Sequence, residues 1–240
     1  MKICYFFLLL IELCIGFNPL LYKLKNPVIA TTTLGIGKKY ISTLSKLDID
    51  RNLTRKIIHI TCAPAFISTW TLYNNFFNRY WATFVPFMSS FYLIYKKNDL
   101  KKSISRSGKS NELFKGPLIY SLILTYITYK FWLFNEIGII SMLQLSIGDG
   151  YADIIGRKYG KNKWFFNKKK SIEGTIGFCI SSFIGSLFFL YLLNILGLNF
   201  KIDIYKLFLL SVFSSFIELI PYIDDNISIP LSIIMLNKFF

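Results

Sequence analysis

The chain has 240 residues, of which 53% are hydrophobic and 18% aromatic, and its formal net charge is +15. The basic residues crowd into the gaps between apolar stretches, which argues against a nucleic-acid-binding protein. Four scattered cysteines and a single histidine indicate neither a zinc site nor a disulfide framework. The unbroken apolar stretches instead predict an all-α, multispanning helical membrane protein, with a soluble all-α protein as the alternative.

The N-terminal segment 1–21 resembles a signal peptide or signal anchor, because Lys2 is followed by the compact apolar run ICYFFLLLIELCIGF. Residues 22–54 are rich in Lys, Thr, Ser and Asn, which predicts a basic leader or linker. Together the two segments are similar to a bipartite leader for a plastid-type organelle. An ordinary signal anchor followed by a basic linker is the alternative.

Seven further apolar stretches predict about seven transmembrane helices. The positive-inside tendency places the two most basic loops, 95–115 and 156–171, on one membrane face. Because successive spans alternate in direction, residues 51–59 and 221–226 belong to that same face. The predicted spans are 57–73, 80–95, 117–134, 137–155, 175–198, 204–220 and 227–240.

The segment GDGYADIIGRKYGK (148–161) places two carboxylates at the end of an apolar run. Asp149 and Asp153 are four residues apart, so on a helix they lie on one side, and Gly156 and Gly160 continue that side without side chains. Carboxylate oxygens suit Mg²⁺, which typically binds one or two carboxylates plus substrate phosphate. The alternative is a helix end whose carboxylates pair with local lysines. The basic residues that follow, suited to phosphate, are Arg157, Lys158, Lys161, Lys163, Lys168, Lys169 and Lys170.

The segment KKKSIEGT (168–175) predicts the start of another helix. Ser171 is placed to cap it, and a helix N-terminus favours phosphate, as does the neighbouring Lys170. Glu173 either complements the helix dipole or serves as a further metal or base group, and the sequence leaves these alternatives open.

Two other segments carry polar residues at the same predicted face. In FIELIPYIDDNISIP (216–230), Glu218 lies within an apolar span and Asp224 and Asp225 follow the helix-breaking Pro221. We expect one of these acids to hold metal and one to accept a proton from an attacking hydroxyl. In TRKIIHI (54–60), Arg55, Lys56 and His59 either anchor the helix at the interface or contact the nucleotide.

Taken together, these segments resemble the polyprenol kinase family, which includes phytol, farnesol and dolichol kinases. The resemblance rests on RKIIH (55–59), GDGYADIIGRKYGK (148–161), KKSIEGT (169–175) and ELIPYIDDNISIPL (218–231), and the compact length is closest to phytol and farnesol kinases. One departure is the final span, which is short. The resemblance implies an integral membrane kinase domain over 55–240, with a nucleotide-binding region at Asp149, Asp153, Gly156, Gly160, Lys170, Ser171 and Glu173.

The resulting hypothesis is a CTP-dependent kinase that phosphorylates the terminal hydroxyl of an isoprenoid alcohol such as phytol, farnesol or geranylgeraniol. The expected catalytic residues are Asp149, Asp153, Asp224 and Asp225, with Mg²⁺ on Asp149 and Asp153. The expected nucleotide and phosphate contacts are Gly148, Gly156, Arg157, Gly160, Lys161, Lys170, Ser171, Glu173, Arg55, Lys56 and His59.

The expected location is a membrane of the endoplasmic reticulum or of a plastid-type organelle, with the basic face toward cytosol or stroma. The expected partners are the alcohol, a nucleoside triphosphate and the lipid bilayer, with no nucleic acid. A cytidylyltransferase of the CDP-diacylglycerol synthase type is the nearest alternative, and a membrane transporter is a more distant one.

Overall fold

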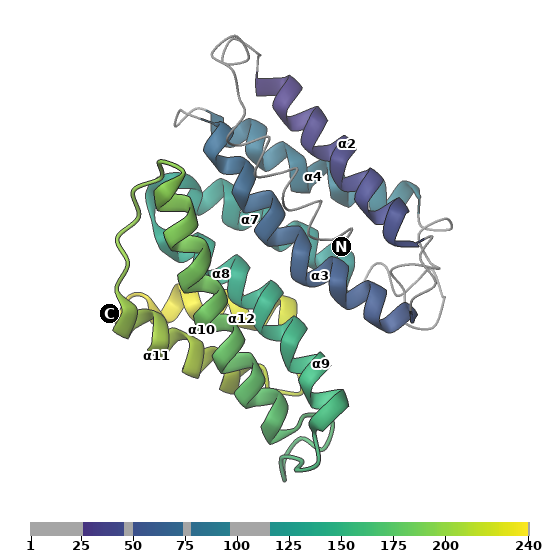
Figure 1. Ribbon diagram of the computed structural model, residues 1–240, viewed down its shortest axis with the longest axis vertical. Helices are drawn as coiled ribbons and strands as arrows, with labels where there is room; N and C mark the ends of the chain where they lie inside the picture. Colours follow the sequence, from purple (N-terminus) through teal and green to yellow (C-terminus); the bar gives the residue numbers. More distant parts are fainter. Residues whose placement is uncertain (1–25, 46–49, 74–77, 97–115, 240) are drawn as a thin grey trace.

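The computed structural model describes residues 26–45, 50–73, 78–96 and 116–239, and within these ranges the chain is helical with no named strand (Figure 1). The predicted all-α class is confirmed. The segment predicted as a signal, 1–21, lies outside the described residues. The helices are α2 (Asn26–Ser45), α3 (Arg51–Ser68), α4 (Arg79–Tyr95), α7 (Pro117–Phe131), α8 (Glu136–Leu143), α9 (Asp149–Tyr159), α10 (Ile172–Ile195), α11 (Ile204–Ile217) and α12 (Asp225–Leu236).

Within the described residues, each of the seven apolar stretches lies mostly on helix. The stretch 57–73 forms α3 and the 3₁₀ turn Thr69–Leu72, and 137–155 forms α8, a π-helical turn and much of α9. In the described part of the chain, α10 is the one helix that is both long and apolar enough to cross a membrane on its own. The apolar helices α11 and α12 are shorter.

The region predicted as a basic leader or linker contains α2. Along α2 the buried residues Ala30, Tyr40 and Leu44 face inward, while polar residues face outward. Tyr40 shares a hydrogen bond of 2.8 Å with Thr61 on α3, and α2 packs against both α3 and α4 (Figure 1). These contacts make α2 part of the helical body.

The helices α8 and α9 are joined through the π-helical turn Gln144–Gly148, all of whose residues are buried. A π-turn inserts an extra residue into the helix and is often found at functional sites. Here it lies immediately before Asp149, the first residue of α9. The turn therefore directs the start of α9 toward α3 and α10, with which it packs.

Glycines allow α9 to cross its neighbours closely. A Cβ atom at Gly150 would overlap Ile60 on α3, and one at Gly148 would lie 2.8 Å from the Phe178 ring on α10. A Cβ at Gly174 on α10 would lie 3.0 Å from the Ala152 carbonyl oxygen. The glycines of the GDG segment thus permit helix packing, and Gly148 is buried in that packing.

Side-chain caps define the starts of the helices that frame the site. Ser171 accepts a hydrogen bond of 3.1 Å from the Gly174 amide, which confirms its predicted role as the cap of α10. Asp50 caps α3, Asp203 caps α11 and Asp224 caps α12 in the same way.

Candidate active site

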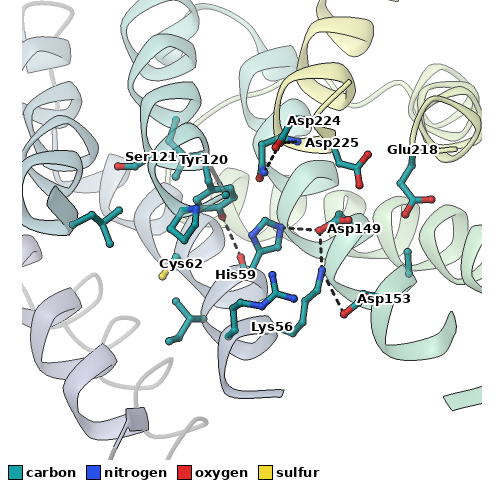
Figure 2. Close-up of a pocket in the computed structure, with 18 of the residues that line it drawn as sticks. Lys56, His59, Cys62, Tyr120, Ser121, Asp149, Asp153, Glu218, Asp224 and Asp225 are labelled. Atoms are coloured by element: carbon teal, nitrogen blue, oxygen red, sulfur yellow. Dashed lines mark hydrogen bonds and ion pairs between the residues drawn. The ribbon is translucent and has the colours of Figure 1, made fainter. Parts of the chain in front are cut away.

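The first group of charged residues joins α3 to the start of α9 (Figure 2). Lys56 Nζ lies 3.1 Å from Asp149 Oδ2 and 3.7 Å from Asp153 Oδ2. His59 Nε2 lies 3.2 Å from Asp149 Oδ2 and 3.1 Å from the Leu145 carbonyl oxygen, so a proton on Nε2 can serve either acceptor. Lys56 and His59 are three residues apart, which places both on the face of α3 that meets α9.

Tyr120 on α7 holds His59 in place. Its ring lies 4.6 Å from the His59 ring, centroid to centroid, and its hydroxyl donates a hydrogen bond of 3.1 Å to the His59 carbonyl oxygen. The aromatic contact and the hydrogen bond restrict the imidazole to the side of α3 that faces Asp149. Tyr120 was not among the residues predicted from the sequence, since a tyrosine in an apolar stretch carries no distinguishing pattern.

The second group joins the loop before α10 to the region between α11 and α12. Lys170 Nζ lies 3.0 Å from Asp225 Oδ2 and makes a very short contact with Glu218 Oε1. Glu218 is buried, and Asn167 from the same loop donates a hydrogen bond of 2.9 Å to the Leu219 carbonyl oxygen. The loop is thus fastened to the end of α11 beside the carboxylates.

The two groups meet at three carboxylates. One oxygen each from Asp149, Glu218 and Asp225 lies within 4.8 Å of the other two. Three hard oxygen donors at this separation, together with the adjacent cationic Lys170, fit a site for a small divalent cation and its phosphate ligands. We call these three residues the carboxylate cluster.

The carboxylate cluster differs from the metal pair expected from the sequence. Asp153 does lie on the same side of α9 as Asp149, as the four-residue spacing predicts. However, its Oδ1 is held 3.0 Å from Arg157 Nε, four residues further along α9, and its other oxygen faces Lys56. Glu218 and Asp225 therefore accompany Asp149 in the cluster in place of Asp153.

Lys170 is positively charged in this setting. Burial alone would lower the pKa of its ammonium group, but the negative charges of Glu218 and Asp225 outweigh burial and raise that pKa above its ordinary value. The lysine stays protonated across the physiological range, so it provides a fixed cation beside the cluster.

Glu173, in the first turn of α10, holds the loop of residues 160–171, which we call the basic loop, and this role was not among the alternatives named from the sequence. Its Oε1 accepts hydrogen bonds from the Lys161 amide at 3.2 Å, the Asn162 amide at 3.1 Å and the Asn162 side chain at 3.0 Å. Trp164 Nε1 donates to Thr175 Oγ1 at 2.9 Å and fastens the same loop to α10. Glu173 is therefore an anchor of the loop and lies outside the carboxylate cluster.

One cavity of about 1390 Å³ connects the two charged groups with an apolar chamber. The polar end includes the carboxylate cluster, and the chamber extends between α2, α3, α4 and α7 past Cys62, Phe66 and Val85. The predicted site residues that line the cavity are Arg55, Lys56, His59, Asp149, Asp153, Gly156, Arg157, Gly160, Lys170, Ser171, Asp224 and Asp225.

Four predicted residues, Gly148, Lys158, Lys161 and Glu173, are not among those that line the cavity. Lys163, Lys168 and Lys169, which the sequence indicated as suited to phosphate, also line the cavity, as does the buried Glu218. Glu218 carries a usable sequence signal, since a lone acid in an apolar stretch is costly unless it has a partner. The α2 residues that line the chamber carry no such signal.

Comparison with curated proteins identifies relatives over most of the chain. A probable chloroplastic phytol kinase of Zea mays is 39% identical over 200 residues, covering 77% of this chain and 65% of the relative. Phytol kinase 1, chloroplastic, of Arabidopsis thaliana is 33% identical over 245 residues, covering 94% of this chain and 79% of the relative. The chloroplastic farnesol kinase of Arabidopsis thaliana is 32% identical over 221 residues, covering 85% of this chain and 70% of the relative.

The chain spans 65% and 66% of the length of the Zea mays relative and of a probable phytol kinase from Triticum aestivum. No protein-family model matches the chain, and no solved structure matches it.

Proposed function

Since the chain belongs to the family of phytol and farnesol kinases, we propose that it phosphorylates the terminal hydroxyl of an isoprenoid alcohol in a plastid membrane. One observation carries the proposal: a single cavity joins an apolar chamber to a cluster of carboxylates and fixed cations. An isoprenoid alcohol is a hydrocarbon with one hydroxyl group. Such a molecule fits with its tail in the chamber and its hydroxyl at the carboxylate cluster.

The proposed donor is CTP, the nucleotide that the resemblance to the polyprenol kinases implies. Arg157, Lys163 and Lys168 line the polar end of the cavity and are available to bind its phosphates. Asp149 and Glu218, the two cluster carboxylates that do not serve as the proton acceptor, would hold Mg²⁺, whose role when bound is to neutralise charge on the donor phosphates. Lys170 adds a cation next to those carboxylates, within reach of the transferred group.

Phosphoryl transfer depends mainly on positioning and on neutralising charge. In the proposed reaction the alcohol oxygen forms a bond to the γ-phosphorus, the bond from that phosphorus to the bridging oxygen breaks, and CDP leaves. Asp225, whose side chain is 29% exposed toward the cavity, is the proposed acceptor of the alcohol proton. Asp224 Oδ1 accepts the capping hydrogen bond of the Asn226 amide at 3.0 Å and a second from the Asn226 side chain at 2.7 Å, and its proposed role is to position the start of α12, where Asp225 lies.

We also propose that α3, α4, α7, α8–α9, α10, α11 and α12 cross the membrane, as the seven apolar stretches predict. The apolar length of α10 and its many outward-facing large hydrophobic residues, including Ile176, Ile180 and Ile184, support this arrangement. A lipid environment would cover these side chains and would deliver the alcohol directly to the chamber.

The test uses the full-length chain in detergent with Mg²⁺ and a panel of farnesol, geranylgeraniol, phytol and dolichol. CTP labelled at the γ-phosphate should transfer its label to an organic-soluble monophosphate, whereas α-labelled CTP should not. In a parallel reaction supplied with phosphatidic acid, transfer of the α-label to the lipid phosphate, with release of pyrophosphate, would identify a cytidylyltransferase instead. Absence of transfer from any triphosphate to any alcohol would overturn the kinase proposal.

A further inference from the structure

The apolar chamber follows one face of α3. The lining residues His59, Cys62, Phe66 and Thr69 recur at spacings of three and four, which is the period of one helix face. From His59 to Thr69 the helix rises about 15 Å, the length of roughly twelve bonded carbons in an extended chain. The chamber is therefore long enough for the first three isoprene units of a prenol whose hydroxyl lies near His59.

The opposite wall of the chamber is α2, which runs antiparallel to α3. Tyr40 bonds to Thr61 at 2.8 Å, and Leu44, one turn later on α2, packs with Ile58, which is earlier on α3. On the inner face of α2, Leu34, Gly37 and Ile41 line the chamber at the same three- and four-residue spacing. α2 therefore closes the chamber on the side opposite α3.

Two lining residues of α2 lack a side chain, Gly35 and Gly37, and of these Gly35 is exposed while Gly37 lies on the inner face. Gly37 is partly buried and lines the cavity, yet a Cβ atom placed on it would meet no atom within 4 Å. By the antiparallel pairing of Tyr40 with Thr61, Gly37 lies level with Pro64, beside the lining residue Ala65 and about 8 Å along α3 from His59. Open space at that depth belongs to the chamber, and a longer side chain would fill it.

We propose that α2 forms the specificity wall of the chamber and that Gly37 determines how long an isoprenoid tail the chamber accepts. This inference rests on the proposed function, because it takes the occupant of the chamber to be the tail of the alcohol. Adding a side chain at Gly37 obstructs the chamber toward the end of the second isoprene unit, since each unit takes about 5 Å of the chamber. Short alcohols then remain substrates and longer alcohols do not.

The test compares wild type, Gly37→Leu and the control Thr32→Leu in the full chain. Thr32 is exposed on α2 and does not line the cavity, so the control adds the same side chain to the same helix outside the chamber. For Gly37→Leu, kcat/KM for phytol and for farnesol should fall by about tenfold or more, while kcat/KM for geraniol should change by less than about twofold. Thr32→Leu should leave all three values within about twofold of wild type.

Equal loss on all alcohols, or no loss on any, would overturn the inference while leaving the kinase proposal intact. A second measurement separates the two proposals if no phosphorylation is seen. The alcohols should raise the unfolding temperature of the wild type, and Gly37→Leu should lose this shift for phytol while keeping it for geraniol. These temperature shifts without any phosphorylation would support the proposal of a specificity wall and reject the proposal of a kinase. If the alcohols do not raise the unfolding temperature of the wild type, the proposal of a specificity wall is rejected.

Discussion

At the scale of single residues, Asp149 is the point where the charged groups meet. It contacts Lys56 and His59 on one side and lies beside Glu218 and Asp225 on the other. Neither set of partners comes from α9, the helix of Asp149. Lys56 and His59 lie on α3, whereas Glu218 lies at the end of α11 and Asp225 at the start of α12. A change at any of these carboxylates therefore alters a shared site.

The carboxylate cluster predicts which residues set the Mg²⁺ requirement. Glu218→Gln keeps the shape of the side chain but removes a negative charge, so the Mg²⁺ concentration for half-maximal activity should rise by about tenfold or more. Asp153→Asn should leave this concentration within about twofold, because Asp153 is held by Arg157 outside the cluster.

Activity titrated against Mg²⁺ measures this difference. Glu136→Gln is the matched control, since Glu136 faces Lys206 at 3.9 Å and does not line the cavity. A larger effect from Asp153→Asn than from Glu218→Gln would restore the metal pair expected from the sequence.

The hydrogen bonds that Glu173 accepts predict how the basic loop responds to a fall in pH. Hydrogen bonds from its own amide, and then from that of Asn162, lower the pKa of its carboxyl group below the ordinary value. A lowered folded-state pKa gives stabilisation that is fully present above the unfolded-state pKa and is lost as pH falls through the folded-state value. The loop should therefore loosen only below about pH 4.5, the ordinary pKa of a glutamate.

Fluorescence of Trp164, which lies in this loop, reports the change when the spectrum of a Trp164→Phe variant is subtracted. Glu173→Gln should abolish the acid transition, because a neutral amide does not titrate. Persistence of the same transition in Glu173→Gln would assign it to another group.

At the scale of helices, close packing of α9 against α10 brings the basic loop to the carboxylate cluster. Gly156, Gly160 and Gly174 lie at this crossing, and Ser171 Oγ occupies the space beside them. The packing explains why glycines follow the two aspartates. From the sequence alone these glycines indicated only a helix side without side chains, and all three also line the cavity.

Gly160→Ala should destabilise the protein by about 1–3 kcal/mol, because the new Cβ would overlap the Gly156 carbonyl oxygen and lie 2.5 Å from Ser171 Oγ. Gly35→Ala is the control, since a Cβ there meets no atom within 4 Å and alanine favours helix by up to about 1 kcal/mol. Unfolding measured in parallel should move in opposite directions for the two variants. Equal stability of Gly160→Ala and wild type would contradict the packing role.

Local patterns predicted part of the site, and long-range contacts determined the rest. The helical period placed Asp149 and Asp153 on one side of α9, and the cap at Ser171 followed from its position before an apolar run. The partnership of Asp149 with Glu218 and Asp225 joins segments distant in the sequence, which periodicity within one segment cannot predict. The helix α2 was missed because its mixed polar composition resembles that of a linker.

At the scale of the whole molecule, the proposed membrane arrangement can be tested through the direction of α10. Its 24 residues span about 36 Å, enough to cross a hydrocarbon core of about 30 Å. The basic loop precedes α10 and residues 199–203 follow it, so the two should lie on opposite membrane faces. The excess of lysine in the basic loop agrees with this orientation.

Single cysteines introduced as Lys161→Cys and Lys201→Cys, in a chain whose native cysteines are replaced, test this arrangement in sealed vesicles. A membrane-impermeant maleimide should label one of them from outside and the other only after the vesicles are opened. Both positions are exposed, so accessibility within the protein does not limit labelling. Labelling of both from the same side would contradict a crossing by α10.

The central claim is that the carboxylate cluster transfers a phosphoryl group to an alcohol held in the adjoining chamber. The most direct measurement is transfer from γ-labelled CTP to farnesol or phytol by the full chain, comparing wild type with Asp149→Asn and with Asp203→Asn. Asp203 caps α11 away from the cavity, and asparagine caps a helix equally well. The account predicts that Asp149→Asn lowers the rate by about a hundredfold or more while Asp203→Asn stays near wild type. Undiminished transfer by a folded Asp149→Asn protein would contradict it.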